Sequence, residues 1–381
     1  MEFNFTEEQL MIQESARDFA QNEIAPSAVQ RDINAEFPYE IVKKLGELGF
    51  MGMMVPPEFG GAGLDTISYV LAMIEISKVD ASVGVIMSVN NSLVCYGLEK
   101  YGSPYIKEKY LIPLAKGEKL GAFALSEPEA GSDATKQKTT ADKDGDYYVL
   151  NGIKNWITNG TTADYVLVMA TTDKSKGHKG ISTFVVEKGF EGFGHGVKED
   201  KLGIRSSDTC SLTFENCRVP AQNLVWEEGK GFNFAMNTLN GGRIGIAAQA
   251  IGIAEASLEA SLKYSKQRKA FGQEISNFQA IQFKLADMAV KVDAAKLLTL
   301  KAAALKDADK PYYKEAAMAK LYASKIAVEC ALEAIQIHGG YGYVREYLVE
   351  RYLRDAKITE IYEGTSEIQR IVIARALLDQ K

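Results

Sequence analysis

The spacing of hydrophobic residues changes twice along this chain, and these changes limit the folds that it can adopt. Up to about residue 120 the spacing is mostly helical. A capping box at Thr6 and Gln9, with Phe5 and Leu10 placed as a hydrophobic staple, predicts a helix that begins at once. Breaks in this helical pattern are predicted at Pro26, at 56–63 and at 102–104.

From about residue 121 the pattern is typical of β structure. Short segments rich in β-branched and aromatic residues are separated by Gly and Asp turns. These segments predict strands at 147–152, 165–169, 181–186 and 210–214. The glycine-rich segment 192–196 is predicted to be a loop between strands.

After residue 229 the helical spacing returns and continues. Five hydrophobic residues step by three or four along one face, namely Ile281, Leu285, Met288, Val292 and Ala295. The clearest loop between helices in this part is 307–311. We therefore predict an N-terminal helical domain at 1–120, a middle β domain at 121–228 and a C-terminal helical bundle at 229–381.

Composition and charge exclude several classes of protein. The chain has 381 residues, of which 46% are hydrophobic and 25% are charged, as expected for a globular protein with a sizeable core and more than one domain. Nothing in the sequence requires a membrane. A net charge of -6 and the lack of a Lys/Arg run argue against nucleic-acid binding.

The four cysteines, Cys95, Cys210, Cys217 and Cys330, form no Cys-x-x-Cys pair and are too few for a disulfide framework. They predict buried free thiols in a reducing compartment. Because the chain has only three histidines besides, we expect no metal site. The first residues carry neither a signal sequence nor an Arg-rich presequence, which indicates a cytoplasmic location.

Two common nucleotide-binding motifs are missing from the sequence. No Gly-x-Gly-x-x-Gly follows a predicted strand, and no Gly-Lys-Ser/Thr of the P-loop type is present. A Rossmann-type nicotinamide site and an ATP site are therefore not expected. A redox cofactor, if there is one, has to be held in another way.

Glu363 is the candidate catalytic base. It lies between Tyr362 and a flexible Gly-Thr-Ser stretch. A free glutamate has a pKa of ~4.3 and removes a carbon-bound proton slowly, but burial against apolar groups can raise the pKa toward ~6 to 7, where a general base works best. A surface glutamate at the end of a helix is the alternative, and this segment alone leaves both interpretations open.

Seven segments resemble the acyl-CoA dehydrogenase family in order and spacing, and within it the short-chain, butyryl-CoA-like members. They are 123–128 with 131–133, 156–160, 201–207, 242–243, 268–272, 336–340 and 362–365. The resemblance extends from end to end. It implies an α+β multidomain fold with an N-terminal α-helical domain, a middle antiparallel β-barrel or sandwich domain and a C-terminal four-helix bundle.

The resemblance implies FAD as cofactor, extended between subunits. Around the isoalloxazine ring it places Phe123, Leu125, Ser126, Trp156, Ile157 and Thr158. From a neighbouring subunit, the pyrophosphate and adenosine portion is contacted by Arg268, Phe271, Gln279, Gln336, Gly339 and Gly340. Thr365, Ser366 and Glu367 match the last FAD contacts, and His338 is expected to pack near the cofactor without a catalytic role. Taken singly, these segments are better explained by β-domain loops and a solvated helix face.

The substrate positions implied by the resemblance are Ser132, Asn240, Arg243, Tyr362 and Gly364. The family often has Asp in place of Asn240 and Gly in place of Glu129, which puts one CoA contact in doubt and adds a negative charge near an anionic ligand. Some relatives carry the base just before the arginine that matches Arg243. That position is Gly242 here, so the carboxylate has to come from Glu363.

The implied reaction is α,β-dehydrogenation of a short-chain acyl-CoA. Glu363 removes the α-proton, the β-hydride goes to flavin N5, and trans-2-enoyl-CoA is formed. The implied partners are electron-transferring flavoprotein, as acceptor, and other copies of the chain in a homotetramer, a dimer of dimers. Two alternatives stay open: a flavin oxidase on the same fold that uses oxygen, including nitroalkane-oxidising relatives, and a non-catalytic acyl-CoA-binding flavoprotein.

Overall fold

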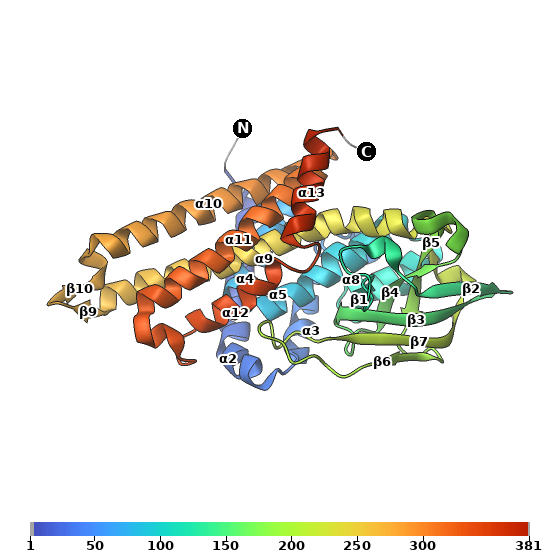
Figure 1. The fold of residues 1–381 in the computed structure, drawn as a ribbon, viewed down its shortest axis with the longest axis horizontal. Helices are drawn as coiled ribbons and strands as arrows, with labels where there is room; N and C mark the ends of the chain where they lie inside the picture. The colour runs from blue at the N-terminus through green and yellow to red at the C-terminus, as the bar shows by residue number, and fades with distance from the viewer. Residues whose placement is uncertain (1–3, 380–381) are drawn as a thin grey trace.

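Helices precede and follow one large sheet in the computed structural model, which describes residues 4–379 (Figure 1). The predicted order of helical, β and helical regions is confirmed. The helices before the sheet are α1 (Glu7–Phe19), α2 (Ala25–Asn34), α3 (Tyr39–Glu47), α4 (Thr66–Val79), α5 (Ala81–Ser88), α6 (Tyr96–Tyr101), α7 (Pro104–Ile106) and α8 (Ile112–Ala115). Three π-helical segments continue them, at Ala20–Ile24, Val89–Cys95 and Lys107–Leu111.

The first helix begins where the sequence predicts. The Thr6 hydroxyl accepts a hydrogen bond from the Gln9 N–H at 3.2 Å, and the Gln9 side chain accepts one from the Thr6 N–H at 3.0 Å. The predicted break at Pro26 is wrong, because the helical course continues through the π-helical segment Ala20–Ile24 into α2. Proline is tolerated there because it lies in the first turn of α2, where its missing N–H costs little.

The sheet consists of β1 (Gly121–Ala124), β2 (Thr140–Asp144), β3 (Tyr147–Thr158), β4 (Tyr165–Thr171), β5 (Ile181–Glu187), β6 (Phe193–His195), β7 (Thr209–Pro220) and β8 (Leu224–Val225). Its main path runs β6-β7-β3-β2-β4-β5-β8, with β1 paired to β4. Most pairs are antiparallel, but β1 and β2 each run parallel to β4. All four predicted strands are present, within β3, β4, β5 and β7.

The segment 192–196 is not wholly a loop as predicted. Phe193–His195 forms the edge strand β6, in which Phe193 lies opposite Phe214 of β7. Glycine disfavours strands, but pairing along an existing strand overrides that local preference.

The elements after the sheet are α9 (Gly231–Gln267), β9 (Lys269–Ala270), β10 (Gln273–Glu274), α10 (Gln279–Asp307), α11 (Tyr313–His338), α12 (Val349–Thr359) and α13 (Ser366–Leu377). As predicted, Met288, Val292 and Ala295 are buried on one face of α10. The loop between α10 and α11 begins at Ala308, within one residue of the prediction. At ~1.5 Å per residue, the 37 residues of α9 span about 55 Å, and α9 packs against α4, α10 and α11.

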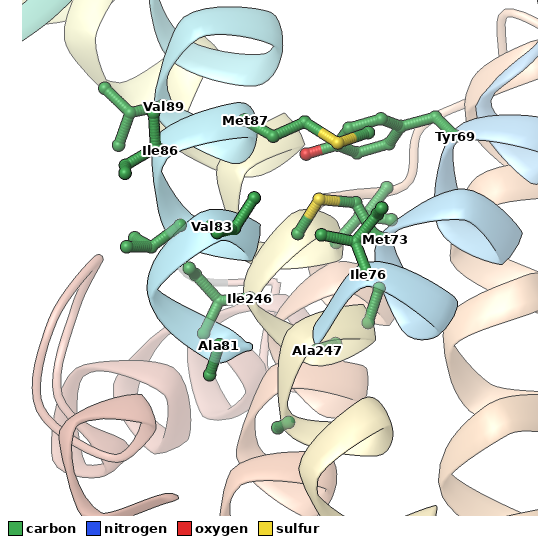
Figure 2. Packing of buried hydrophobic residues seen from close by; sticks show 14 of the residues in the cluster. Tyr69, Met73, Ile76, Ala81, Val83, Ile86, Met87, Val89, Ile246 and Ala247 are labelled. Atoms are coloured by element: carbon green, nitrogen blue, oxygen red, sulfur yellow. The ribbon is translucent and has the colours of Figure 1, made fainter. Parts of the chain in front are cut away.

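The helices that precede the sheet in the sequence and those that follow it share one hydrophobic core. The sheet has a second core of its own. Figure 2 shows side chains of α4, α5 and α9 packed together in the helical core, with the Tyr69 ring beside Met87. The stretch Ala81–Tyr101 has the length and apolar composition of a membrane span, yet 94% of its most apolar window is buried inside the protein. In this structure it is a core element.

The four cysteines are buried and unpaired, as predicted. Burial raises the pKa of Cys210 to about 12 and that of Cys217 to about 11. These thiols therefore stay protonated at neutral pH and act as small apolar side chains.

Candidate active site

Glu363 lies in the turn between α12 and α13. Its Oε2 atom is buried and has no hydrogen-bond partner among the described residues. Burial raises the pKa of the Glu363 carboxyl from 4.5 to about 7, although the positive charges of Lys320 and Arg243 act in the opposite direction. The carboxylate is therefore not a surface group, and it can both hold and release a proton near neutral pH.

The turn that carries Glu363 has an unusual backbone. The φ angles of Glu363 and Gly364 are 51° and 91°, so both residues lie in the left-handed region. For a residue with a side chain this costs about 1–2 kcal/mol. Such strain persists only where the surroundings hold it in place, and it is often found at functional sites.

Side chains from three other helices hold this turn. Lys320 Nζ of α11 donates to the Gly364 carbonyl at 2.7 Å, and Gln369 Nε2 of α13 donates to the same oxygen at 2.8 Å. Gln369 Nε2 also lies 3.2 Å from the Glu363 carbonyl oxygen. The Tyr362 hydroxyl donates to Gln249 of α9. These contacts fix the backbone on both sides of the carboxylate.

Helix α9 lies directly against the carboxylate. A Cβ atom on Gly242 would be 2.0 Å from Glu363 Oε2, so only glycine leaves room for the carboxylate at this position. The next residue, Arg243, is almost fully buried and donates to Asn240 Oδ1 at 2.7 Å. Burial lowers the pKa of Arg243, opposed by Glu363 and Tyr312, but an arginine stays protonated at neutral pH. The amide oxygen of Asn240 is thus occupied by a hydrogen bond from Arg243.

One turn further along α9, two buried side chains fill the space beside the helix. A Cβ atom on Gly245 would lie 2.5 Å from the Ser88 hydroxyl and 2.6 Å from the Tyr69 hydroxyl. The Tyr69 hydroxyl donates to Ser88 Oγ at 3.1 Å, and burial raises the pKa of Tyr69. Protein atoms therefore close this side of the site.

A second group of predicted residues lies on the sheet. Phe123 is in β1 with Leu125 and Ser126 just after it, and Trp156, Ile157 and Thr158 end β3. The Asn155 N–H donates to the Ser126 carbonyl at 2.8 Å and ties the two segments together. The pairing of β3 with β7 is irregular between Lys154 and Ile157, and Trp156 has a φ of 61° and is 62% exposed. A large indole therefore stands out from the end of the sheet.

A buried ion pair between Lys154 and Glu127 also ties these two segments together. Lys154 Nζ lies 2.8 Å from Glu127 Oε1 and 3.1 Å from the Leu125 carbonyl, and both side chains are almost fully buried. Burial lowers the pKa of Lys154 to about 8. Burial acts to raise the pKa of Glu127, but Lys154 and the Lys138 N–H outweigh it and the net shift is downward. Both groups are therefore charged at pH 7.

A third group lies around a pocket of about 640 Å³ at the other end of α9. Its lining includes Arg268, His338, Gly339 and Gly340. The Arg268 guanidinium lies 5.5 Å from the centre of the Tyr341 ring, and Cβ atoms on Gly339 or Gly340 would meet nothing within 4 Å. His338 stacks on Tyr264 at 4.2 Å, and its Nδ1 lies 2.7 Å from the Ala334 carbonyl, which is a packing role.

The remaining predicted residues are exposed or at helix ends. Phe271 is 96% exposed with a φ of 51°. Ser132, Gln279 and Gln336 are exposed. Thr365 caps α13 by accepting from the Ile368 N–H at 3.4 Å, which places Ser366 and Glu367 in the first turn of that helix, beside Glu363.

The structure brings together Glu363, Tyr362, Gly364, Asn240 and Arg243 in one site. It does not bring the Arg268 pocket to the sheet. Strands β4 and β5 contact α9 near its start, whereas β10 contacts α9 near its end, so the two groups are separated by most of the ~55 Å helix (Figure 1).

Comparison with known proteins gives the family. Three family models match: acyl-CoA dehydrogenase N-terminal domain at residues 6–118, middle domain at 122–217 and C-terminal domain at 229–378. The chain belongs to the acyl-CoA dehydrogenase family. A relative from Clostridium acetobutylicum, "Acyl-CoA dehydrogenase, short-chain specific", is 51% identical over 374 residues, covering 98% of this chain and 99% of the relative.

Solved structures agree with this assignment. Butyryl-CoA dehydrogenase from Megasphaera elsdenii is 49% identical with a TM-score of 0.98, over 99% of this chain and 100% of that one. A chain in the structure described as electron transferring flavoprotein of Acidaminococcus fermentans is 52% identical, also with a TM-score of 0.98, over 99% and 100%. Glutaryl-CoA dehydrogenase from Mycobacterium smegmatis in complex with FADH2 is 34% identical with a TM-score of 0.94, over 98% and 95%.

Acyl-CoA dehydrogenases are FAD flavoproteins, and the residues of this chain fit FAD. The exposed indole of Trp156 offers an apolar face for a flat ring, and Ser126 and Thr158 carry hydroxyls in the same two joined segments. At the other end, Arg268, whose guanidinium lies over the Tyr341 ring, and two unobstructed glycines suit a pyrophosphate. No group of three or more His, Cys, Asp or Glu residues suited to a metal ion occurs within residues 4–379.

Two residues of this dehydrogenase site were not identified from the sequence. Lys320 lies on the buried face of α11 in step with Ala316, Ala323 and Ala327, and Lys154 occupies an inward position of β3 in step with Tyr148 and Leu150. A lysine in register with a buried face is a signal that the sequence does contain.

Proposed function

We propose that this chain is a short-chain acyl-CoA dehydrogenase that converts an acyl-CoA thioester to the trans-2-enoyl-CoA. The observation that carries the proposal is the Glu363 carboxylate, which lies against Gly242 and has a pKa raised to about 7. Its buried Oε2 atom has no hydrogen-bond partner within residues 4–379. A base that must remove an α-proton near pH 7 needs an oxygen that is free to accept the proton and a pKa close to the working pH.

In the proposed mechanism Glu363 accepts the α-proton on its buried carboxylate. Negative charge then develops on the thioester oxygen. Among the residues that the structure describes, no group accepts a hydrogen bond from the Glu363 backbone N–H. This N–H is therefore free to donate to the thioester oxygen. Bound FAD supplies the acceptor for the hydride that leaves the β-carbon.

Preference for short acyl chains is supported by the relatives and by packing. The compared proteins are named short-chain specific and butyryl-CoA dehydrogenases. Tyr69 and Ser88 fill the space along α9 next to the carboxylate. A long acyl chain would have to displace these buried side chains.

We also propose that a second copy of the chain completes each cofactor site. One extended dinucleotide cannot reach from the sheet to the Arg268 pocket along a ~55 Å helix within one chain. Phe283, Val290 and Leu297 are 62%, 70% and 52% exposed at intervals of seven residues on α10, a pattern that favours helix pairing with another subunit. A homotetramer built as a dimer of dimers fits both observations.

Arg268→Ala tests this assembly. We expect it to lose FAD and to weaken the tetramer together, because a bound cofactor stabilises only the assembled state. The measurements are flavin absorbance and light scattering of the same sample. FAD held tightly by an isolated monomer would contradict the shared site.

The proposed electron acceptor is electron-transferring flavoprotein. The chain has no second redox motif, so a reduced flavin has to pass its electrons to a partner. One compared chain belongs to a structure described as such a flavoprotein. A cytoplasmic location stays a prediction, supported by four unpaired thiols.

Anaerobic mixing with butyryl-CoA tests the reaction itself. We expect the purified protein to be yellow and its flavin absorbance to bleach on mixing. Yellow protein that does not bleach would exclude the dehydrogenase and favour a binding protein. Rapid reoxidation in air with stoichiometric peroxide would favour a flavin oxidase.

A further inference from the structure

Lys320 is a fully buried lysine whose only hydrogen bond from the ammonium among the described residues goes to the Gly364 carbonyl. The distance is 2.7 Å, and the side chain has no exposed surface. A buried ammonium without a carboxylate in contact is costly and seldom kept without a reason. The residue it contacts directly follows Glu363.

The charged groups around this lysine come from several elements. Glu363 and Glu360 lie in and before the turn, Glu367 begins α13, and Arg243 belongs to α9. The Glu363 carboxylate is faced by Lys320 and Arg243, and its charge also reaches the buried hydroxyls of Tyr69 and Tyr362. Burial lowers the pKa of Lys320 to about 8, so the ammonium is still charged at pH 7.

Neither cation closes an ion pair on the base. Among the described residues, no N···O distance of 4.0 Å or less joins Glu363 to Lys320 or Arg243, and Glu363 Oε2 has no hydrogen-bond partner. Both charges therefore act on the carboxylate through space while its oxygen stays free to take a proton. A direct ion pair would hold the carboxylate more firmly and block that oxygen.

We propose that Lys320 is a positioning residue for the dehydrogenation: it holds the Gly364 carbonyl, and with Arg243 it supplies the positive charge that keeps Glu363 ionised in a buried site. This proposal rests on the proposed function of Glu363 as the base. Gln369 shares the first task, because it donates to the same carbonyl, but it carries no charge. The second task therefore falls to the two cations.

The test is the pH profile of single-turnover flavin reduction by butyryl-CoA, measured anaerobically by stopped flow. In the wild type we expect the rate to rise with pH around a midpoint near 7, as Glu363 loses its proton. Lys320→Met removes the charge and the donor. The midpoint should move up by about one pH unit or more, since an opposite charge at this range shifts a carboxyl by ~1–3 units. The rate at pH 6.5 should fall by about eightfold or more and largely recover by pH 9.

Three further variants separate charge from structure. Lys320→Gln keeps a donor without a charge and should also show the raised midpoint; it decides the matter if Lys320→Met does not retain FAD. Lys320→Arg should keep the wild-type midpoint. Gln369→Leu removes the uncharged donor to the same carbonyl and should slow the reaction without moving the midpoint.

Lys306→Met is the matched control for loss of a lysine with a lowered pKa. Lys306 is partly buried, and burial lowers its pKa to about 8, but Glu363 is not among its charged neighbours, so the midpoint should not move. A wild-type midpoint in both neutral Lys320 variants would overturn the proposal and leave Lys320 a merely structural residue. Wild-type protein that butyryl-CoA does not bleach at any pH would instead refute the proposed function.

Discussion

Gly242 and Glu363 compete for the same space: a Cβ atom on Gly242 would lie 2.0 Å from the Glu363 Oε2 atom. Some members of the family that the sequence resembles carry the base just before the matching arginine, which is the position of Gly242. The clash gives a physical reason why a chain can place its carboxylate on α9 or on the turn after α12, but not on both.

Gly242→Ala should therefore strongly reduce activity while leaving the helix intact. The new methyl group would also lie 2.8 Å from Leu93 Cδ2, so the carboxylate has to move. We expect the rate of flavin reduction to fall ~100-fold or more, because small displacements of a catalytic group have effects of this size. Gly241→Ala is the control, since its Cβ would meet the nearest atom only at 3.7 Å. Equal activity of the two variants would show that the contact is unimportant.

Glu363→Gln should keep the fold and the yellow FAD and lose flavin reduction by acyl-CoA. Loss of a general base typically costs ~10²- to 10⁴-fold. The neighbouring carboxylates do not replace it, because Glu367 is exposed and neither Glu360 nor Glu367 is among the charges that act on Glu363. Rapid-mixing absorbance with butyryl-CoA measures the effect. A variant that stays within tenfold of the wild-type rate would remove Glu363 from the mechanism.

The same substitution should make the protein more stable at high pH. The pKa of Glu363 is about 7 in the folded protein against 4.5 ordinarily, so the unfolded chain ionises first as pH rises. The wild type thus loses stability between about pH 4.5 and 7, by ~3 kcal/mol for a shift of this size, and the loss is complete above pH 7. Glutamine does not ionise. The Tm advantage of Glu363→Gln should be small at pH 5 and largest at pH 8, and an advantage that does not change with pH would contradict the raised pKa.

The sequence predicted the order of the elements well, because hydrophobic spacing reports directly on buried faces. It failed where tertiary context decides. Pro26 does not break the helical course because it falls in the first turn of α2, directly after a π-helical segment. Phe193–His195 forms a strand only because it pairs with the edge of β7. Neither effect is visible in a local window of residues.

The candidate site shows the same division. Glu363 stands out in the sequence because of its glycine-rich turn, but the space that its carboxylate occupies depends on Gly242, more than a hundred residues earlier in the chain. Lys320 reaches the turn from α11, and the sequence shows only that a lysine falls on a buried helix face. Contacts between distant segments set the pKa of the base, and one sequence does not reveal them.

Lys154→Met should loosen the two segments that are proposed to face the flavin. It leaves Glu127 buried without its cation, which typically costs ~3–5 kcal/mol. We expect a lower Tm and faster loss of FAD on dilution. Lys138→Met is the matched control, because Lys138 pairs with Glu129 in an exposed position, where ion pairs contribute little. Equal FAD retention in the two variants would show that the buried pair does not support the cofactor site.

The last prediction concerns acyl-chain length. Each further buried methylene adds ~0.8 kcal/mol of binding, or roughly fourfold, until the chain meets the end of the pocket. Here Tyr69 and Ser88 fill the space beside α9 close to the base, and the Tyr69 hydroxyl is held by Ser88 at 3.1 Å. Moving them would break a buried hydrogen bond, so the gain per methylene should stop early.

We therefore expect kcat/KM to peak at about four to six acyl carbons and to fall at least ~10-fold by about eight to ten, with branched isovaleryl-CoA a poor substrate throughout. Steady-state kinetics with straight-chain thioesters of about four to sixteen carbons measures this. An optimum at about eight carbons or beyond would refute the short-chain assignment but leave the dehydrogenase reaction in place. In that case Tyr69 and Ser88 would have to move when substrate binds, and the space that they occupy in this structure would belong to the pocket.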